Sequence, residues 1–123
     1  MRDNPRITIN AAGSVVTMEF RDHIGIAELK AHADRIDALP SKVQPGFTAL
    51  VDLTGLGSMD PESVPTLSLI MERLGKAGVA RVVRVIPDPR KDIGLGILSL
   101  FHYKSGVKIN TVPTRAEADR LVS

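Results

Sequence analysis

Two aspartates, Asp52 and Asp60, flank a short segment that follows an apolar run near the middle of the chain. A pair of carboxylates at the end of a strand could bind a divalent cation or transfer protons. No third carboxylate follows at a spacing suited to a metal site. We therefore favour structural roles, in which Asp52 ends a strand and accepts hydrogen bonds from loop amides while Asp60 caps a helix.

Other residue types that carry chemistry are sparse. His23, His32 and His102 lie far apart, and none has a second ligand at metal-binding spacing on the same face. The chain has no cysteine, which excludes disulfides and thiolate chemistry, and it has no Gly-x-Ser-x-Gly nucleophile elbow. We expect no catalytic residue, no metal and no cofactor, although the residue order alone leaves a Ser-His-Asp set open.

The composition narrows the class of partner. Aromatic residues make up 3% of the chain and the net charge is +2, so base stacking and tight binding to a phosphate backbone are not expected. No apolar run approaches the length of a membrane span, and charges stand where a signal peptide would have its apolar core. We expect one cytoplasmic domain covering residues 1–123.

Hydrophobic periodicity gives the elements that position these residues. Alternating apolar residues predict two antiparallel strands, Arg6–Asn10 and Ser14–Phe20, joined by a turn at Gly13. The pattern then changes to a helical period over Ile24–Leu39, with Asp22 as the expected N-cap. Pro40 ends this helix.

The rest of the chain alternates strands and helices. A continuous apolar run, Phe47–Leu53, predicts a central strand covered on both faces. The later elements are a helix from Pro61, a strand at Arg81–Ile86, a helix at Asp92–Tyr103, a strand at Val107–Thr111 and a closing helix capped by Thr114. We expect an α/β fold, a mixed sheet of about five strands with four helices in the order β-β-α-β-α-β-α-β-α.

The segment Asp52-Leu53-Thr54-Gly55, followed by four residues and then Asp60, resembles a motif of the STAS domains. This family of anti-sigma-factor antagonists, with its SpoIIAA-like group, has a strand, then D-L-S/T-G, four residues, and D-S-S/T-G at a helix start. The expected order of elements extends the resemblance over nearly the whole chain. It implies a SpoIIAA-like fold and a regulatory role.

The chain departs from the family at the phosphorylation site. In the family, the Ser after the second Asp is phosphorylated by a partner kinase that is also an anti-sigma factor, and this controls binding. Pro61 stands at that position here and cannot accept a phosphate. Ser58 and Ser63 are the nearest hydroxyls, and we interpret them as solvated loop and first-turn residues. The usual phosphorylation switch is therefore expected to be missing.

Apolar residues outside the expected core indicate a binding surface. Leu95 and Leu98 fall beside His102 on one flank of their helix, and Leu69 falls on a face that should be solvated. Together with the motif residues these make a candidate interaction surface: Thr54, Gly55, Ser58, Asp60, Glu62, Ser63, Leu69, Leu95, Leu98 and His102.

Two functions follow from these observations. The first is a non-catalytic STAS-like regulatory module that binds a protein, either an anti-sigma-type kinase or sigma-factor regulator, or a second copy of itself. The second is a small-molecule or lipid-type binding protein, with an apolar pocket between sheet and helix near Leu95, Leu98 and Phe101. An enzyme is the third reading, for which no catalytic set is evident.

Overall fold

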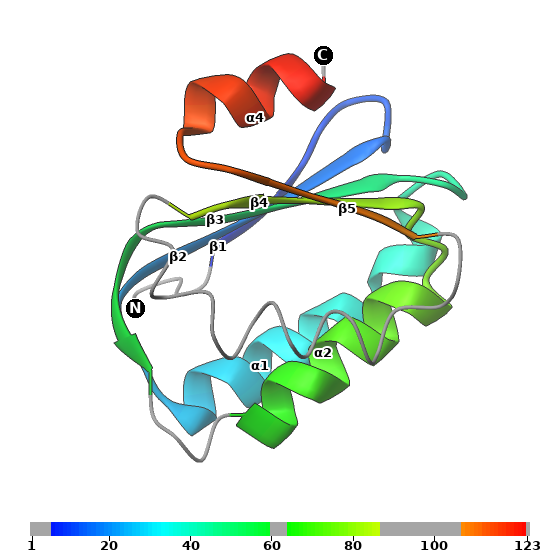
Figure 1. The fold of residues 1–123 in the computed structure, drawn as a ribbon. Coiled ribbons are helices and arrows are strands. Elements are labelled where there is room, and N and C mark those ends of the chain that lie inside the picture. Colours follow the sequence, from blue (N-terminus) through cyan, green and yellow to red (C-terminus); the bar gives the residue numbers. More distant parts are fainter. Residues whose placement is uncertain (1–5, 60–63, 87–106, 123) are drawn as a thin grey trace.

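Five strands form one mixed sheet in the described part of the chain, which comprises residues 6–59, 64–86 and 107–122 of a computed structural model (Figure 1). The strands are β1 (Arg6–Ile9), β2 (Val15–Ile24), β3 (Thr48–Met59), β4 (Arg81–Val85) and β5 (Lys108–Val112). Their order in the sheet is β1-β2-β3-β4-β5. The first pair is antiparallel and the other three are parallel. The predicted mixed sheet of five strands is confirmed.

Helices cover both faces of this sheet. The described helices are α1 (Ile26–Asp37), a 3-10 turn η1 (Leu39–Ser41), α2 (Val64–Lys76) and α4 (Arg115–Val122). Figure 1 shows α1 and α2 side by side on one face and α4 on the other. The described residues thus contain three α-helices, and the fourth predicted one, Asp92–Tyr103, lies outside them. No described helix has the length and apolarity needed to cross a membrane.

The two faces bury cores of very different size. The larger core lies between the sheet and helices α1 and α2, and it includes fully buried residues from each layer, such as Val16, Leu29 and Leu74. The smaller core lies under α4, where Leu50, Val83 and Val85 of the sheet pack against Ala118. Because few apolar side chains hold α4, polar contacts are expected to matter more for its position.

Local turn signals were predicted correctly. The hairpin between β1 and β2 turns at Gly13, whose φ of 68° is in the left-handed region. The side chain of Asn10 accepts hydrogen bonds from the amides of Ser14 and Val15 at 2.8 and 3.0 Å, which fixes the turn. At the other end of the chain, Thr114 Oγ1 accepts a bond from the Glu117 amide and caps α4 as expected.

The start of α1 was predicted wrongly. Asp22 does not cap the helix but lies in β2, where its φ is 53°, and the N-cap is Gly25 without a side-chain hydrogen bond. The reason is that residues 21–24 pair with the far end of β3. Strand pairing satisfies the backbone groups here, so the helix begins only at Ile26.

The central strand is also longer than predicted. β3 continues through Met59, so the segment expected to be a loop after Leu53 is an extended strand paired with β2. β4 reaches only to the level of Asp52. Among the described strands, β2 and β3 therefore extend beyond their neighbours as a two-stranded ribbon.

Helix α2 follows residues 60–63, which lie outside the described part of the chain, as do the predicted cap Asp60 and the predicted first residue Pro61. Pro65 is the second residue of α2, in the first turn, where its missing N–H would have no partner within the helix. The helix ends before Gly78, whose φ of +100° lies in the left-handed region typical of a residue that follows a helix C-terminus.

Candidate functional site

The Asp52-Leu53-Thr54-Gly55 segment forms a bulged stretch of β3. Glu19 pairs with Asp52 and Arg21 pairs with Gly55, so β3 uses one more residue than β2 over this interval. Oδ1 of Asp52 accepts a hydrogen bond from the Thr54 amide at 2.9 Å. The carboxylate thus partners a backbone N–H within the bulge, and the motif residues are accounted for by local structure.

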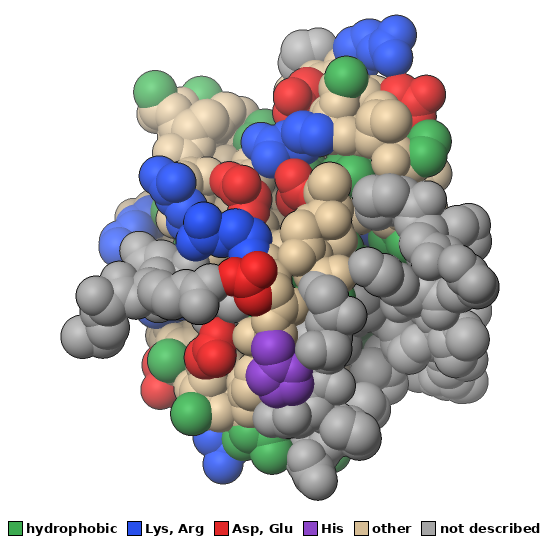
Figure 2. Space-filling model, turned by 90° about the vertical axis from the view of Figure 1, so that its left-hand side faces the viewer, with side chains coloured by type: hydrophobic (Ala, Val, Ile, Leu, Met, Phe, Trp, Pro, Cys, Tyr) green, Lys and Arg blue, Asp and Glu red, His purple; other side chains and the backbone are tan. Residues whose placement is uncertain are grey.

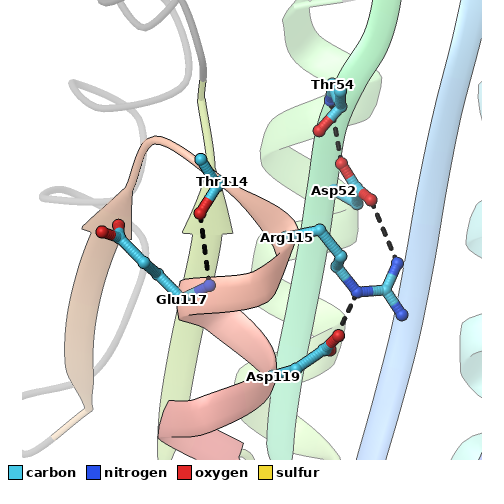
Figure 3. A network of polar contacts seen from close by, with 6 residues as sticks. All are labelled: Asp52, Thr54, Thr114, Arg115, Glu117 and Asp119. Carbon is cyan, nitrogen blue, oxygen red and sulfur yellow. Dashed lines mark hydrogen bonds and ion pairs between the residues drawn. The ribbon is translucent and has the colours of Figure 1, made fainter.

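The other carboxylate oxygen of Asp52 connects this strand to the C-terminal helix. Arg115 Nη1 donates to Asp52 Oδ2 at 3.0 Å, and Arg115 Nε donates to Asp119 Oδ1 at the same distance (Figure 3). The Asp52 side chain is only 12% exposed, against 38% for Arg115. Charge-assisted hydrogen bonds of this kind are stronger than neutral ones, most of all where water is partly excluded.

This network holds Asp52 in its ionised form. Burial by itself raises the pKa of Asp52, but the hydrogen bonds from Thr54 and the charge and hydrogen bond of Arg115 outweigh burial and lower it. Burial also lowers the pKa of Arg115, and its two carboxylate partners outweigh that effect and raise it. A carboxylate held as an anion by two donors is poorly suited to proton transfer at neutral pH.

The far end of α4 has a second arginine anchor. Arg81 on β4 donates from Nη1 to the Leu121 carbonyl at 3.0 Å and from Nε to Asn110 Oδ1 at 2.9 Å. A cation at the C-terminus of a helix satisfies an unpaired carbonyl and complements the helix dipole. Helix α4 is thus attached to the sheet by Arg115 at its first turn and by Arg81 at its last.

The described residues of the candidate interaction surface do not form one continuous patch. Thr54 and Gly55 are exposed and lie in β3 beside the Asp52–Arg115 contact. Leu69, 38% exposed, lies on α2, on the opposite side of the sheet. Ser58 lies in β3, where it pairs with His23. The remaining members fall outside the described residues: Asp60, Glu62, Ser63, Leu95, Leu98 and His102.

Gly55 lies where β2 and β3 approach closely. A Cβ atom added at this position would lie 3.3 Å from Arg21 Cγ and 3.4 Å from the Phe20 carbonyl oxygen. Glycine therefore fits the bulge without displacing the neighbouring strand. This packing reason accounts for Gly55 without a ligand, while its exposure leaves it accessible to a partner.

Leu69 borders a groove between α1 and α2 with a volume of about 320 Å³. The described side chains around it are Lys30, Ala33, Asp34, Thr66, Leu69 and Arg73. Arg73 pairs with Asp37 at 3.0 Å across the two helices. The exposed leucine that the sequence indicated is thus the apolar centre of a charged groove.

The histidines and carboxylates do not assemble into a reactive site in the described residues. His32 is fully buried, and its Nε2 lies 3.1 Å from Met18 Sδ. No group of three or more His, Asp or Glu side chains in the described part of the chain could hold a metal ion. Asp60, the other carboxylate of the pair considered from the sequence, lies outside that part, so its expected role as a helix cap stays a prediction.

The side of the molecule at the left of Figure 1 is mixed in charge. Figure 2 shows basic and acidic side chains interspersed over the described part of this face, with hydrophobic side chains only in small separate areas. Interspersed charges of both signs suit contact with another protein better than contact with a phosphate backbone, which requires a surface of one sign.

Sequence reasoning missed Arg115 and Asp119. The Asp52–Arg115 contact joins residues 63 positions apart, which no local pattern reports. A signal for half of the network was present, since Arg115 and Asp119 stand four residues apart on a helix that the sequence did predict.

Comparison with solved structures identifies the fold. The structure is similar to a DUF3478-family protein with a SpoIIAA-like fold from Shewanella loihica PV-4, with a TM-score of 0.73 and 12% identity over 96% of this chain and 93% of that one. It is also similar to the anti-sigma factor antagonist SpoIIAA in its unphosphorylated form, with a TM-score of 0.64 and 16% identity over 94% and 96% of the two chains.

A third similar structure is apo-SiaC from Pseudomonas aeruginosa, with a TM-score of 0.56 and 13% identity over 87% of this chain and 90% of that one. Compared by sequence, the chain matches no family model and no curated protein. The low identities establish the fold alone. The chain has a SpoIIAA-like fold, and the resemblance drawn from the Asp52–Gly55 motif is confirmed at that level.

Proposed function

We propose that this chain is a non-catalytic, STAS-like regulatory module that acts by binding another protein. The observation that carries this proposal is the likeness to SpoIIAA, an anti-sigma factor antagonist, over 94% of the chain. The partner we propose is an anti-sigma-type kinase or a sigma-factor regulator, and self-association through the same surface is the alternative. Because one fold supports many functions, the candidate surface must also be suited to binding a protein.

Two features of that surface support protein binding. The ribbon formed by residues 21–24 and 55–59 extends beyond β4 and leads into the segment before α2, where the family motif places its contact site. Thr54 and Gly55 are exposed there, on a backbone held in place by Asp52. A surface preorganised in this way loses less entropy when a partner binds.

The chemistry of the motif argues against catalysis as the primary role. The one described aspartate of the motif is already bonded to Thr54 and Arg115, and its pKa is lowered. An acid or base in an active site is expected to have a pKa shifted toward neutrality instead. Asp52 therefore serves in our proposal as a structural support for the binding segment.

Site-specific crosslinking tests this proposal. A photoreactive benzoylphenylalanine is placed at Thr54, at Leu69 and, as a control, at Lys108, which is exposed at the opposite end of the parallel strands. In cells of the native organism, the Thr54 probe should yield one recurring adduct that mass spectrometry identifies as a kinase or sigma-factor regulator. Adducts of equal intensity from Lys108, or none from Thr54 and Leu69, would contradict the proposal.

We further propose that regulation does not use phosphorylation at the usual helix start, because Pro61 has no hydroxyl. Incubation with a kinase of the anti-sigma family and labelled ATP should leave the wild-type chain unlabelled. The variant Pro61→Ser restores the family hydroxyl and provides the matched positive control. Labelling of wild-type Ser58 or Ser63 would refute this part of the proposal without affecting protein binding.

The lipid-type alternative stays a prediction, since Leu95, Leu98 and Phe101 lie outside the described residues. Organic extraction of the purified protein followed by mass spectrometry tests it. A stoichiometric acyl compound would favour this alternative over the regulatory module.

A further inference from the structure

We propose that the outer edge of β1, with the groove beneath it, binds an extended acidic segment of a partner protein as an added β-strand. This site lies at the opposite edge of the sheet from β5 and is separate from the Thr54–Gly55 surface. Strand addition is a common mode of peptide recognition, in which backbone bonds give affinity and side-chain pockets give specificity.

The first observation is the orientation of backbone groups along β1. This strand is the end member of the described sheet, and its only described partner is β2. The Asn10 amide donates to the Val15 carbonyl at 3.1 Å, which makes this pair a hydrogen-bonded one. Because bonded and non-bonded pairs alternate in an antiparallel ladder, the N–H and C=O groups of Ile7 and Ile9 point away from β2.

The second observation is a groove directly beside these two residues. It has a volume of about 300 Å³ and lies between β1 and the C-terminal end of α1. The described side chains that line it are Ile7, Ile9, Arg35, Ala38, Leu39 and Lys42. Ile7 and Ile9 are each half-buried, packing partly against the larger core. The same two residues thus offer both outward backbone groups and an apolar floor.

The positive charge of the groove favours an acidic partner segment. Among the described lining residues, Arg35 and Lys42 are cationic and none carries a carboxylate. In an added strand, alternate side chains would point toward the groove. An apolar residue at one such position would meet the isoleucines, and a glutamate or aspartate at the next would meet the exposed Lys42. The occupant we propose is therefore an extended segment that alternates apolar and acidic residues on one face.

The length and charge of β1 favour pairing with a specific partner strand over non-specific edge-to-edge association. The described strand, Arg6–Ile9, has four residues, and Arg6 and Thr8 are exposed on its other face. Short edge strands with a charged residue resist edge-to-edge aggregation. A partner then requires the complementary charge as well as a strand, which favours an acidic segment over a second copy of this basic edge.

The test uses a synthetic peptide, Thr-Val-Thr-Glu-Thr-Val-Thr, and a matched control in which lysine replaces glutamate. Amide NMR of the full chain should show slowed hydrogen exchange at Ile7 and Ile9 with the acidic peptide. We expect the lysine peptide to bind about tenfold more weakly. Equal binding of the two peptides, or shifts confined to Thr54 and Leu69, would overturn the proposal.

Variants separate the backbone contribution from the side-chain contribution. Ile9→Pro removes an outward-facing N–H and keeps the ladder with β2, whereas Ile9→Val keeps the amide. We expect Ile9→Pro to weaken binding of the acidic peptide about tenfold and Ile9→Val to leave that binding unchanged. Lys42→Glu, at an exposed position, should reverse the preference between the two peptides even if Ile9→Pro fails to fold.

One further outcome concerns the nature of the ligand. Hexanoate offers a carboxylate and an apolar chain but no strand. If hexanoate alone reproduced the protection at Ile7 and Ile9, the groove would be a site for a small acid and strand addition would be refuted. Binding at the Thr54 surface can be measured with the same samples, so the two proposals fail independently.

Discussion

Arg115 on α4 donates a 3.0 Å hydrogen bond to Asp52 on β3, and the same carboxylate accepts the Thr54 amide. One aspartate therefore links the C-terminal helix to the bulge in the central strand. Within the described residues, the small apolar core under α4 has four buried members, Leu50, Val83, Val85 and Ala118. The position of α4 consequently depends on polar contacts more than that of α1 or α2.

Removing Arg115 should loosen α4. We expect Arg115→Ala to lower the free energy of unfolding by about 1–2 kcal/mol, because it leaves Asp52 partly buried without its charged partner. Arg115→Lys should recover only part of this loss, since an ammonium cannot bond both carboxylates in the same fork geometry. Urea unfolding monitored by circular dichroism gives both values.

The control for this prediction is Asp119→Ala, which removes the exposed half of the network. The Asp119 side chain is 59% exposed, so its pair with Arg115 should contribute less than about 0.5 kcal/mol. If Asp119→Ala lowers the free energy of unfolding more than Arg115→Ala does, Asp52 is not the dominant partner of Arg115.

Replacing Asp52 should separate its two roles. Asp52→Asn keeps an oxygen acceptor for the Thr54 amide and loses the charge that holds Arg115, whereas Asp52→Ala loses both. We expect unfolding free energies to fall by about 1 kcal/mol for Asn and about 2–3 kcal/mol for Ala. Amide exchange at Thr54 reports the local effect, and it should accelerate only in Asp52→Ala.

The pH dependence of this contact has a definite sign. The pKa of Asp52 is lower in the folded protein than its ordinary value of 3.8, so the unfolded chain binds a proton more readily. The stabilisation is therefore present above pH 3.8 and is lost as the pH falls through the folded pKa. Asp52→Asn should remove this contribution to acid unfolding. If the free energy of unfolding of Asp52→Asn changes with pH below 3.8 as it does in the wild type, this prediction is wrong.

Local signals in the sequence predicted most of the fold. Gly13 and Thr114 fix a turn and a helix start through their own backbone or side chain, and both are found where expected. Hydrophobic periodicity likewise predicted the type and order of the described strands and helices. These features depend on neighbours within a few residues, which a sequence pattern reports directly.

What the sequence did not predict depends on contacts between distant segments. Polar residues and glycines after Leu53 are typical of a loop, yet residues 55–59 form a strand because residues 21–24 lie beside them. The role of Arg115 likewise appears only when α4 packs on the sheet and brings it to Asp52. The motif was recognisable in the sequence, but its bulge and its support were tertiary features.

Replacement by alanine of each of two glycines near the end of α2 should change the free energy of unfolding in opposite directions. Gly75 lies within the helix, and a Cβ there would meet nothing within 4 Å. Gly75→Ala should therefore raise the unfolding free energy by about 0.5–1 kcal/mol. Gly78 has a φ of +100°, so Gly78→Ala should lower it by about 1 kcal/mol or more. Thermal unfolding of the pair tests both, and stabilisation by Gly78→Ala would contradict the assigned helix end.

Buried His32 should make the fold sensitive to mild acid. Burial lowers the pKa of His32 from 6.5 to about 3, with a smaller contribution from the nearby positive charge of Arg35. The folded protein keeps the ring neutral while the unfolded chain binds a proton below pH 6.5. Stability should therefore fall as the pH drops from 6.5 toward 3, with a limiting slope of about 1.4 kcal/mol per pH unit.

His32→Leu should remove this dependence because it leaves no group to titrate. Nδ1 of His32 has no hydrogen-bond partner among the described residues, and Phe20 and Met18 lie against the ring. We therefore expect His32→Leu to change the free energy of unfolding little at pH 7 and to be more stable than the wild type at pH 4.5. His23→Gln, at an exposed position, is the matched control and should keep the wild-type slope. If His32→Leu keeps that slope as well, a group other than His32 governs the response to acid between pH 6.5 and 4.5.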